Sequence, residues 1–198
     1  MKWLVLPSFL FCAAFVLSAQ TILNPTDDLQ AAVNSASPGS TLLLNPGTYS
    51  LSGTLVVTKA LTIRSNQPTP PTIQVPDGSV VAVQLSANDI TLEAVNITGG
   101  NWGIYAGDPG GGATSNIVIR SVNVDTNAAS PGHGVYIGKV ANAVLDRVAV
   151  ADAQVNGILI ANGSSNAVVT GCTVGTTGGP DSAIKINNSA SAYVVGNT

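Results

Sequence analysis

Cysteine, aromatic residues and charge are all scarce in this chain of 198 residues. It contains 2 cysteines, 5% aromatic and 9% charged residues, and its formal net charge is −3. Cys12 lies in the apolar N-terminal segment, which leaves Cys172 without a partner for an internal disulfide. The cysteine count excludes a disulfide scaffold, a zinc finger and a redox motif. With only 7 lysine and arginine residues, the chain lacks the positive charge that binds nucleic acids or anionic membrane surfaces, and we expect neither as a partner.

The first 19 residues have the pattern of a secretory signal peptide. Lys2 precedes a largely apolar run from Trp3 to Leu17, and Ser18-Ala19 supplies the small residues of a cleavage site. The run is too short for a membrane span, and no later segment reaches the roughly 18 uninterrupted apolar residues that a span needs. We therefore predict a signal peptide over 1–19 and a secreted domain without a membrane span over 20–198.

The main feature that is present is a repeat of short apolar–polar alternations. The first alternation of each repeat recurs at offsets of 29, 27, 26, 24 and 26 residues, beginning at Leu61, Ile90, Ile117, Ala143, Ala167 and Tyr193. A second alternation follows the middle four directly, at Val95–Ile97, Val122–Val124, Val148–Val150 and Cys172–Val174. A third comes after a variable loop, at Val83–Leu85, Ile104–Ala106, Val135–Ile137, Ile158–Ile160 and Ile184–Ile186.

Three short strands in each repeat predict an all-β fold, a right-handed parallel β-helix of about six or seven coils. Equivalent strands then stack into three parallel sheets with about 4.8 Å between coils. The stretch from Pro68 to Pro76 holds four prolines and predicts a loop or an edge.

The sequence also predicts a specific feature at each end of the coil. Thr26-Asp27-Asp28 has the pattern of an N-cap and an acidic first turn, and with Leu29–Val33 it predicts a short helix that caps the N-terminal mouth. The sequence stops at Asn197-Thr198, one strand into a coil. Because an uncovered parallel edge invites pairing, we expect either a longer protein or end-to-end self-association.

Equivalent positions of successive repeats also form columns. Asparagines precede the first strand at a predicted left-handed bend: Asn88, Asn116, Asn142 and Asn166. Outward positions of the first strand alternate in charge and predict a ladder of ion pairs: Arg64, Glu93, Arg120 and Asp146. Cys172 falls in an inward column with Val95, Val122 and Val148, which predicts a buried, unreactive thiol.

Three segments near the start of the repeat region are Leu29–Val33, Ser37–Tyr49 with its Asn-Pro-Gly-Thr-Tyr run, and Leu61–Ile63. Together they resemble the opening of right-handed β-helix proteins of the pectate-lyase-like (pectin lyase fold) superfamily, and the likeness extends over the mature chain. The resemblance implies a carbohydrate cleft along the third strand of each repeat. It is less informative about chemistry, because such proteins include lyases, epimerases, glycosidases and non-catalytic surface proteins.

The outward column of the third strand contains the candidate binding residues. It reads Gln84, Tyr105, Tyr136, Leu159 and Lys185. Two tyrosines beside an amide and an ammonium predict a surface for sugar rings and a partner for a uronate carboxylate. Trp102, just before Tyr105's strand, is a further candidate for stacking on a sugar. The alternative is that these are ordinary exposed strand residues.

His133 is the one histidine, and its Gly-His-Gly context resembles a motif of polygalacturonase-type glycosidases. The paired aspartates and the Arg-Ile-Lys of those enzymes have no counterpart here, which disfavours hydrolysis. A lyase or epimerase instead needs a base and a cation beside the uronate carboxylate, and the candidates are His133, Lys139 and Lys185. Three loop carboxylates are candidate Ca²⁺ ligands, although isolated loop aspartates also cap turns: Asp125, Asp152 and Asp181.

Two functions stay open at this point. The first is a secreted β-helix that binds, and processes by a lyase-like or epimerase-like reaction, an acidic polysaccharide. The second is a non-catalytic extracellular structural or adhesive β-helix. The residue pattern leaves it undecided whether the protein is an enzyme, since it offers a binding face without a complete catalytic motif.

Overall fold

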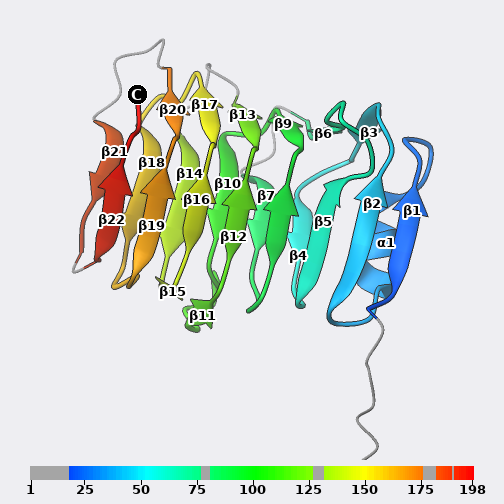
Figure 1. The fold of residues 1–198 in the computed structure, drawn as a ribbon, viewed down its shortest axis with the longest axis horizontal. Helices are drawn as coiled ribbons and strands as arrows, with labels where there is room; N and C mark the ends of the chain where they lie inside the picture. Colours follow the sequence, from blue (N-terminus) through cyan, green and yellow to red (C-terminus); the bar gives the residue numbers. More distant parts are fainter. Residues whose placement is uncertain (1–17, 77–80, 127–131, 176–181, 189) are drawn as a thin grey trace, which may run out of the picture.

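Parallel strands coil around one long hydrophobic core. The computed structural model describes residues 18–76, 81–126, 132–175, 182–188 and 190–198. Its three main sheets have 8, 6 and 6 strands, and the described residues contain one short helix. The predicted all-β parallel β-helix is therefore confirmed, and Figure 1 shows its strands stacked from β1 at one end to β22 at the other. The predicted signal peptide falls mainly on residues 1–17, which lie outside the described residues.

Successive strands of the chain pass from sheet to sheet as it winds. Sheet A stacks in the order β1 (Gln20–Leu23), β2 (Ser40–Leu44), β5 (Leu61–Ser65), β8 (Thr91–Glu93), β12 (Val118–Arg120), β16 (Val144–Asp146), β19 (Ala167–Thr170) and β22 (Ala192–Val195). Sheet B contains β3 (Thr48–Ser50), β6 (Thr72–Gln74), β9 (Asn96–Thr98), β13 (Asn123–Asp125), β17 (Ala149–Ala151) and β20 (Thr173–Val174). Sheet C contains β4 (Leu55–Val57), β7 (Val81–Leu85), β10 (Trp102–Ala106), β14 (His133–Gly138), β18 (Asn156–Ala161) and β21 (Ser182–Ile186). A small pair joins β11 (Thr114–Ser115) to β15 (Val140–Ala141).

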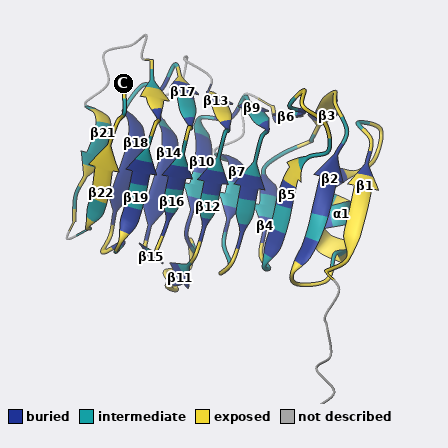
Figure 2. Cartoon of the chain, in the orientation of Figure 1, coloured by how far each residue is buried: buried dark blue, intermediate teal, exposed yellow. Residues whose placement is uncertain are grey.

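The core consists of inward columns of aliphatic side chains. On sheet A, Leu92, Ile119 and Leu145 are paired in register and each is 0% exposed. Alternation along each strand sends these residues inward and their neighbours outward. Exposed residues are instead concentrated on the first and last strands of sheet A, β1 and β22 (Figure 2).

Two of the strands that were not predicted from the sequence are β1 and β6. β1 precedes the first recognisable repeat, yet Gln20–Leu23 pairs with β2. β6 lies within the proline-rich stretch that predicted a loop or an edge, and it pairs on both sides with β3 and β9. Its residues, Thr72–Gln74, are the proline-free part of that stretch, and Pro71 serves as a backbone acceptor for the Asn96 N–H at 2.8 Å. Proline lacks a donor but keeps its carbonyl, and this explains why an interior strand fits there.

The predicted bends before sheet A carry stacked amides, with one correction. Asn116, Asn142 and Asn166 have φ values of 59°, 58° and 54°. Asn142 Nδ2 donates to Asn116 Oδ1 at 3.2 Å, and Asn166 Nδ2 donates to Asn142 Oδ1 at 3.4 Å. In the preceding coil the left-handed residue is Asp89, with φ of 57°, and not Asn88. Aspartate adopts this conformation readily and accepts from Asn116 Nδ2 at 2.8 Å.

The predicted charge column is in register, but only part of it forms ion pairs. Arg120 lies 4.0 Å from Glu93 and 3.4 Å from Asp146. Among the ion pairs of the described residues there is none between Arg64 and Glu93, although β5 and β8 pair these residues directly. Arg147 pairs with Asp146 at 2.9 Å instead. These exposed contacts are each worth roughly 0.2–1 kcal/mol, so they serve register more than stability.

The N-terminal mouth is closed by α1 (Leu29–Ser35), as predicted. Asp28 is the N-cap and its side chain accepts from the Ala31 N–H at 2.9 Å, but the first turn of α1 contains no acidic residue, contrary to the expectation. The Gln30 side chain bonds both edge groups of Val56 on β4, accepting from its N–H at 2.8 Å and donating to its carbonyl at 3.0 Å. The amide thereby takes the place of a neighbouring strand.

Apolar side chains are exposed on the last coil. On β22, Tyr193 is 63% and Val195 47% exposed, and on β21 Ile186 is 43% exposed. End-to-end self-association through these strands remains a prediction. Within the described ranges, no helix is both long and apolar enough to cross a membrane.

Cys172 is 1% exposed and lies among core residues, which confirms its predicted burial. Burial raises the pKa of its thiol above the ordinary value of 9.0. The folded state therefore holds this proton more tightly than the unfolded state, so the thiol's contribution to the unfolding free energy is constant below about pH 9 and falls as the pH rises further. We expect Cys172 to resist a thiol reagent at about pH 8 until urea unfolds the chain.

The test compares urea unfolding of the wild type and Cys172→Val at about pH 7 and about pH 10. The variant is expected to lose less stability on this pH change. The tyrosines titrate in both proteins, so their effect cancels in the comparison. Rapid labelling of Cys172 in the native protein would contradict the predicted burial.

Candidate functional site

Sheet C carries a contiguous cluster of rings on its outward face. Tyr105 of β10 and Tyr136 of β14 are paired in register, and their ring centroids are 4.9 Å apart with an interplanar angle of 23°. Trp102 joins them at centroid distances of 6.0 Å from Tyr105 and 5.4 Å from Tyr136. His133 packs edge-on against Trp102 at 4.7 Å and 74°. We call Trp102, Tyr105, His133 and Tyr136 the aromatic cluster.

The two tyrosines stack because the coil spacing equals a stacking distance. Paired residues of adjacent strands lie about 4.8 Å apart, which suits offset-stacked rings. Tyr136 has Tyr105 on one side and Leu159 on the other, so it is only 8% exposed although it points away from the core. Trp102 and Tyr105 keep more of their surface accessible. A ligand on this face would therefore meet Trp102 and Tyr105 before Tyr136.

Glycines near both ends of β14 allow close packing against neighbouring residues. A Cβ on Gly134 would lie 2.1 Å from Val150 Cγ1 and 2.7 Å from the Gly157 carbonyl oxygen. At the other end of β14, a Cβ on Gly138 would lie 2.5 Å from Tyr136 Cε1. The Tyr136 ring therefore packs over Gly138, where the side chain of any other residue would clash with it.

Burial raises the pKa values of both tyrosine hydroxyls. For Tyr105 the nearby Tyr136 and Asp108 raise it further, because each disfavours a phenolate. For Tyr136 the hydrogen bond from Asn162 Nδ2 to its hydroxyl, at 2.6 Å, acts in the opposite direction but is smaller than the effect of burial. At neutral pH both groups are protonated phenols, which can donate a proton or a hydrogen bond.

Gln84 and Lys185 occupy the predicted row on either side of the tyrosines. Gln84 is paired with Tyr105, and its Nε2 donates to Ser86 Oγ at 3.0 Å, which orients the amide along the strand. Lys185 is paired with Leu159, the residue next to Tyr136. It therefore lies two strands from Tyr136, roughly 10 Å at the usual strand spacing.

Lys139 is separated from His133 by the length of β14. His133 begins that strand and Lys139 follows its last residue, a separation of roughly 20 Å at the usual rise per residue. Lys139 Nζ donates to the Gly111 carbonyl at 3.0 Å. The structure thus brings His133 to Trp102 and Tyr136 but does not bring Lys139 to His133.

Two of the candidate calcium ligands, Asp125 and Asp152, lie at sheet B. Asp125 ends β13 and is exposed, and Asp152 follows β17 with φ of 59°. The register pairs Asp125 with Ala151, which makes Asp152 its diagonal neighbour. Asp181 lies outside the described residues. The described ranges contain no group of three or more histidine, cysteine or acidic residues arranged to hold a metal ion.

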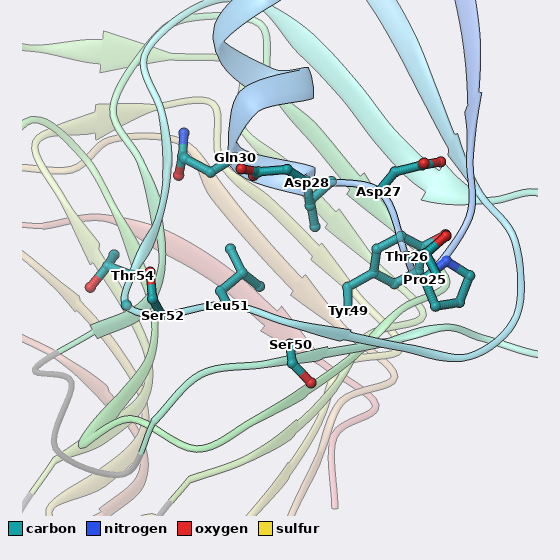
Figure 3. Close-up of a pocket in the computed structure, with 12 residues that line it drawn as sticks. Pro25, Thr26, Asp27, Asp28, Gln30, Tyr49, Ser50, Leu51, Ser52 and Thr54 are labelled. Atoms are coloured by element: carbon teal, nitrogen blue, oxygen red, sulfur yellow. The ribbon is translucent and has the colours of Figure 1, made fainter.

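A cavity of about 550 Å³ lies at the N-terminal end, between the start of α1 and the turn from β3 to β4 (Figure 3). Asp27 and Asp28 line it. Asp27 Oδ2 accepts from the Asn24 N–H at 2.7 Å, and Asp28 Oδ1 is the helix cap. None of the predicted site residues lines this cavity, and its carboxylates have structural partners, so it belongs to the N-terminal cap.

Two polar residues of the site were not predicted. Asn162 bonds the Tyr136 hydroxyl, and Asn156 contacts His133. Asn156 is the first residue of β18 and is paired with His133 in register. The repeat alignment already placed Asn156 one coil after His133, and this is the signal that could have identified it.

No family model matches this chain, and no curated protein matches it. Among solved structures, the crystal structure of an alginate lyase from Paenibacillus sp. str. FPU-7 matches with a TM-score of 0.58 and 18% sequence identity. The match covers 85% of this chain and 75% of that chain. At this identity the likeness supports the β-helix fold, while membership of the pectate-lyase-like superfamily remains a prediction.

Proposed function

We propose that this protein binds an acidic polysaccharide across the aromatic cluster of sheet C and processes it by a lyase-like or epimerase-like reaction. The observation that carries the proposal is the packing of Trp102, Tyr105 and Tyr136 with His133 on one outward face. Aromatic rings with polar tips are suited to sugars, whose surfaces combine C–H groups and hydroxyls. The likeness to an alginate lyase supports the substrate class, because alginate is a polymer of uronates.

The proposed reactions begin with removal of the proton next to the uronate carboxylate. In a lyase reaction the resulting electron pair forms a carbon–carbon double bond as the glycosidic C–O bond breaks, and the leaving oxygen takes a proton. In an epimerase reaction a proton returns to the opposite face of the same carbon. Both reactions need a group that stabilises the charge developing on the carboxylate. His133 and Lys185 remain the candidates for this chemistry on sheet C.

The protonated phenol of Tyr105 adds a donor to this surface. Its raised pKa keeps the proton in place at neutral pH, so it can bond a sugar oxygen or protonate a leaving oxygen. Lys139 and a Ca²⁺ ion at Asp125, Asp152 and Asp181 stay separate predictions. Secretion, predicted from residues 1–19, is consistent with an extracellular polysaccharide as the partner.

The direct test uses the tryptophan of the cluster. Trp102 is the one tryptophan beyond residue 19, so its fluorescence in the mature chain reports on this face alone. We expect saturable changes with alginate or polygalacturonate and none with a neutral glucan. Ultraviolet absorbance of the unsaturated product then detects lyase action, and exchange of the sugar C–H proton with deuterated water detects epimerisation. No response to either uronan would overturn the proposal.

Replacement of Lys185 by glutamine should weaken uronan binding a few-fold at low salt. The side chain is partly exposed, so its attraction to a carboxylate is worth about 1 kcal/mol or less and is screened by salt. The measurement is the fluorescence titration at two salt concentrations. Arg64→Gln, the same change of charge on sheet A, is the matched control. Equal losses in both variants would assign the effect to net charge rather than to sheet C.

A binding protein without catalysis is the second candidate. The separation of Lys139 from His133 favours it, because the three basic candidates do not lie together at one place on the surface. Saturable binding without unsaturated product and without proton exchange would select this extracellular structural or adhesive role.

A further inference from the structure

Asn156 is the most deeply buried polar residue in contact with the aromatic cluster. It is 2% exposed, and its Nδ2 lies 3.2 Å from His133 Nδ1. Its Oδ1 is buried and has no hydrogen-bond partner among the described residues. A buried acceptor without a donor is unfavourable, because it loses its hydrogen bond to water and gains none in the protein. Formation of the coil alone therefore does not explain why a polar side chain occupies this position.

The structural role of the other stacked asparagines does not explain Asn156. Asn116, Asn142 and Asn166 are exposed, have left-handed backbones and bond one another's amides. Asn156 lies within a strand, and its partners in register are His133 and Ser182. The side-chain contact that it makes is with an imidazole and not with another amide.

The direction of this contact determines where the ring proton lies. An imidazole nitrogen that accepts from an amide N–H carries no proton, so the neutral ring keeps its proton on Nε2. Turning the amide over would bury two N–H donors where one carbonyl oxygen now lies, and buried amide N–H groups without partners are rarer than such carbonyls. The observed orientation is therefore the less costly one.

We propose that Asn156 is a positioning residue for His133, whose amide nitrogen holds the imidazole and keeps its proton on Nε2. Resting on the proposed function, the inference assigns His133 a role toward a uronate: its Nε2–H is a hydrogen-bond donor to the carboxylate. His133 is then a recognition group, and removal of the sugar proton falls to another side chain.

The test is a long-range proton–nitrogen correlation spectrum of the nitrogen-15-labelled mature chain. His133 is the only histidine, so its two ring nitrogens are assigned without ambiguity. At a pH where the ring is neutral, we expect the pattern of a single Nε2–H tautomer. The Nδ1–H tautomer, or an even mixture, in the wild type would overturn the proposal without any variant having to fold.

Two variants separate positioning from packing. Asn156→Ala should replace the single tautomer by a mixture, and Asn156→Asp should move the proton to Nδ1, because a carboxylate only accepts. The control is Asn123→Ala on sheet B, where Nδ2 donates to Asn96 Oδ1 at 2.8 Å and no change at His133 is expected. An unchanged tautomer in folded Asn156→Ala contradicts the proposal.

Addition of alginate oligomers distinguishes this inference from the proposed function. A shift of the Nε2–H signal with saturation supports both. The predicted tautomer without a response to uronate leaves the role of Asn156 in place and counts against the uronate as ligand. A saturable response from a ring with Nδ1–H supports binding and overturns the assignment of Asn156.

Discussion

Replacement of Ile119 by alanine is expected to lower the free energy of unfolding by about 2–5 kcal/mol. Ile119 is 0% exposed and lies between Leu92 and Leu145 in the inward column of sheet A. The truncation leaves a cavity in the middle of a stack whose upper and lower neighbours are held by their own strands. Those strands are constrained by backbone pairing and cannot collapse fully into the gap.

The measurement is urea unfolding followed by circular dichroism, with Val118→Ala as the matched control. Val118 precedes Ile119 on β12 and faces outward, partly exposed. Its truncation should change the unfolding free energy by about 1 kcal/mol or less. Similar losses for both variants would mean that the two faces of β12 are not distinguished by burial, and the coiled arrangement would be wrong for this strand.

Replacement of Tyr105 by alanine should weaken uronan binding by roughly thirtyfold, the effect of losing about 2 kcal/mol at an aromatic contact. Tyr105 combines an accessible ring with a protonated hydroxyl, and it stacks on Tyr136 at 4.9 Å. Tyr136→Ala is the less informative variant, because that side chain is 8% exposed and supports its neighbours. The readout is Trp102 fluorescence, with isothermal calorimetry as an independent measure.

Two controls accompany this prediction. Tyr105→Phe keeps the ring and removes the hydroxyl, so it separates packing against the sugar from hydrogen bonding. Tyr193→Ala removes a tyrosine that is 63% exposed on β22 of sheet A, and binding should be unaffected. Unchanged affinity in Tyr105→Ala would remove the aromatic cluster from the binding site.

Repetition explains why much of this fold is predictable from one sequence. Each coil places equivalent residues about 4.8 Å apart, so an alignment of repeats also predicts contacts. Cys172 illustrates this: its column predicted burial, and the thiol is 1% exposed. The same alignment predicted the row of Tyr105 and Tyr136. It failed where the repeat is irregular, at β1 before the first full repeat and at Asn88, where the bend falls on Asp89.

The contacts within the site depend on side-chain packing, which an alignment of the repeats does not predict. Tyr136 was expected on an outward face, and its covering by Tyr105 and Leu159 depends on how the side chains lean over their neighbours. The contact of Asn156 with His133 depends on two side-chain rotamers in a crowded space. Lys139 was predicted together with His133 as a basic candidate on the same side of the coil, but the length of β14 separates the two residues.

The amino-acid pattern alone therefore determined the coil, its three sheets, its capping helix and which residues face outward, because these follow from the period of the repeat and from alternation along each strand. Only the tertiary structure decided which outward side chains touch, which are covered and which amide orients the histidine. Such contacts arise from packing between side chains of different coils, and packing depends on shapes and rotamers that a one-dimensional period does not contain.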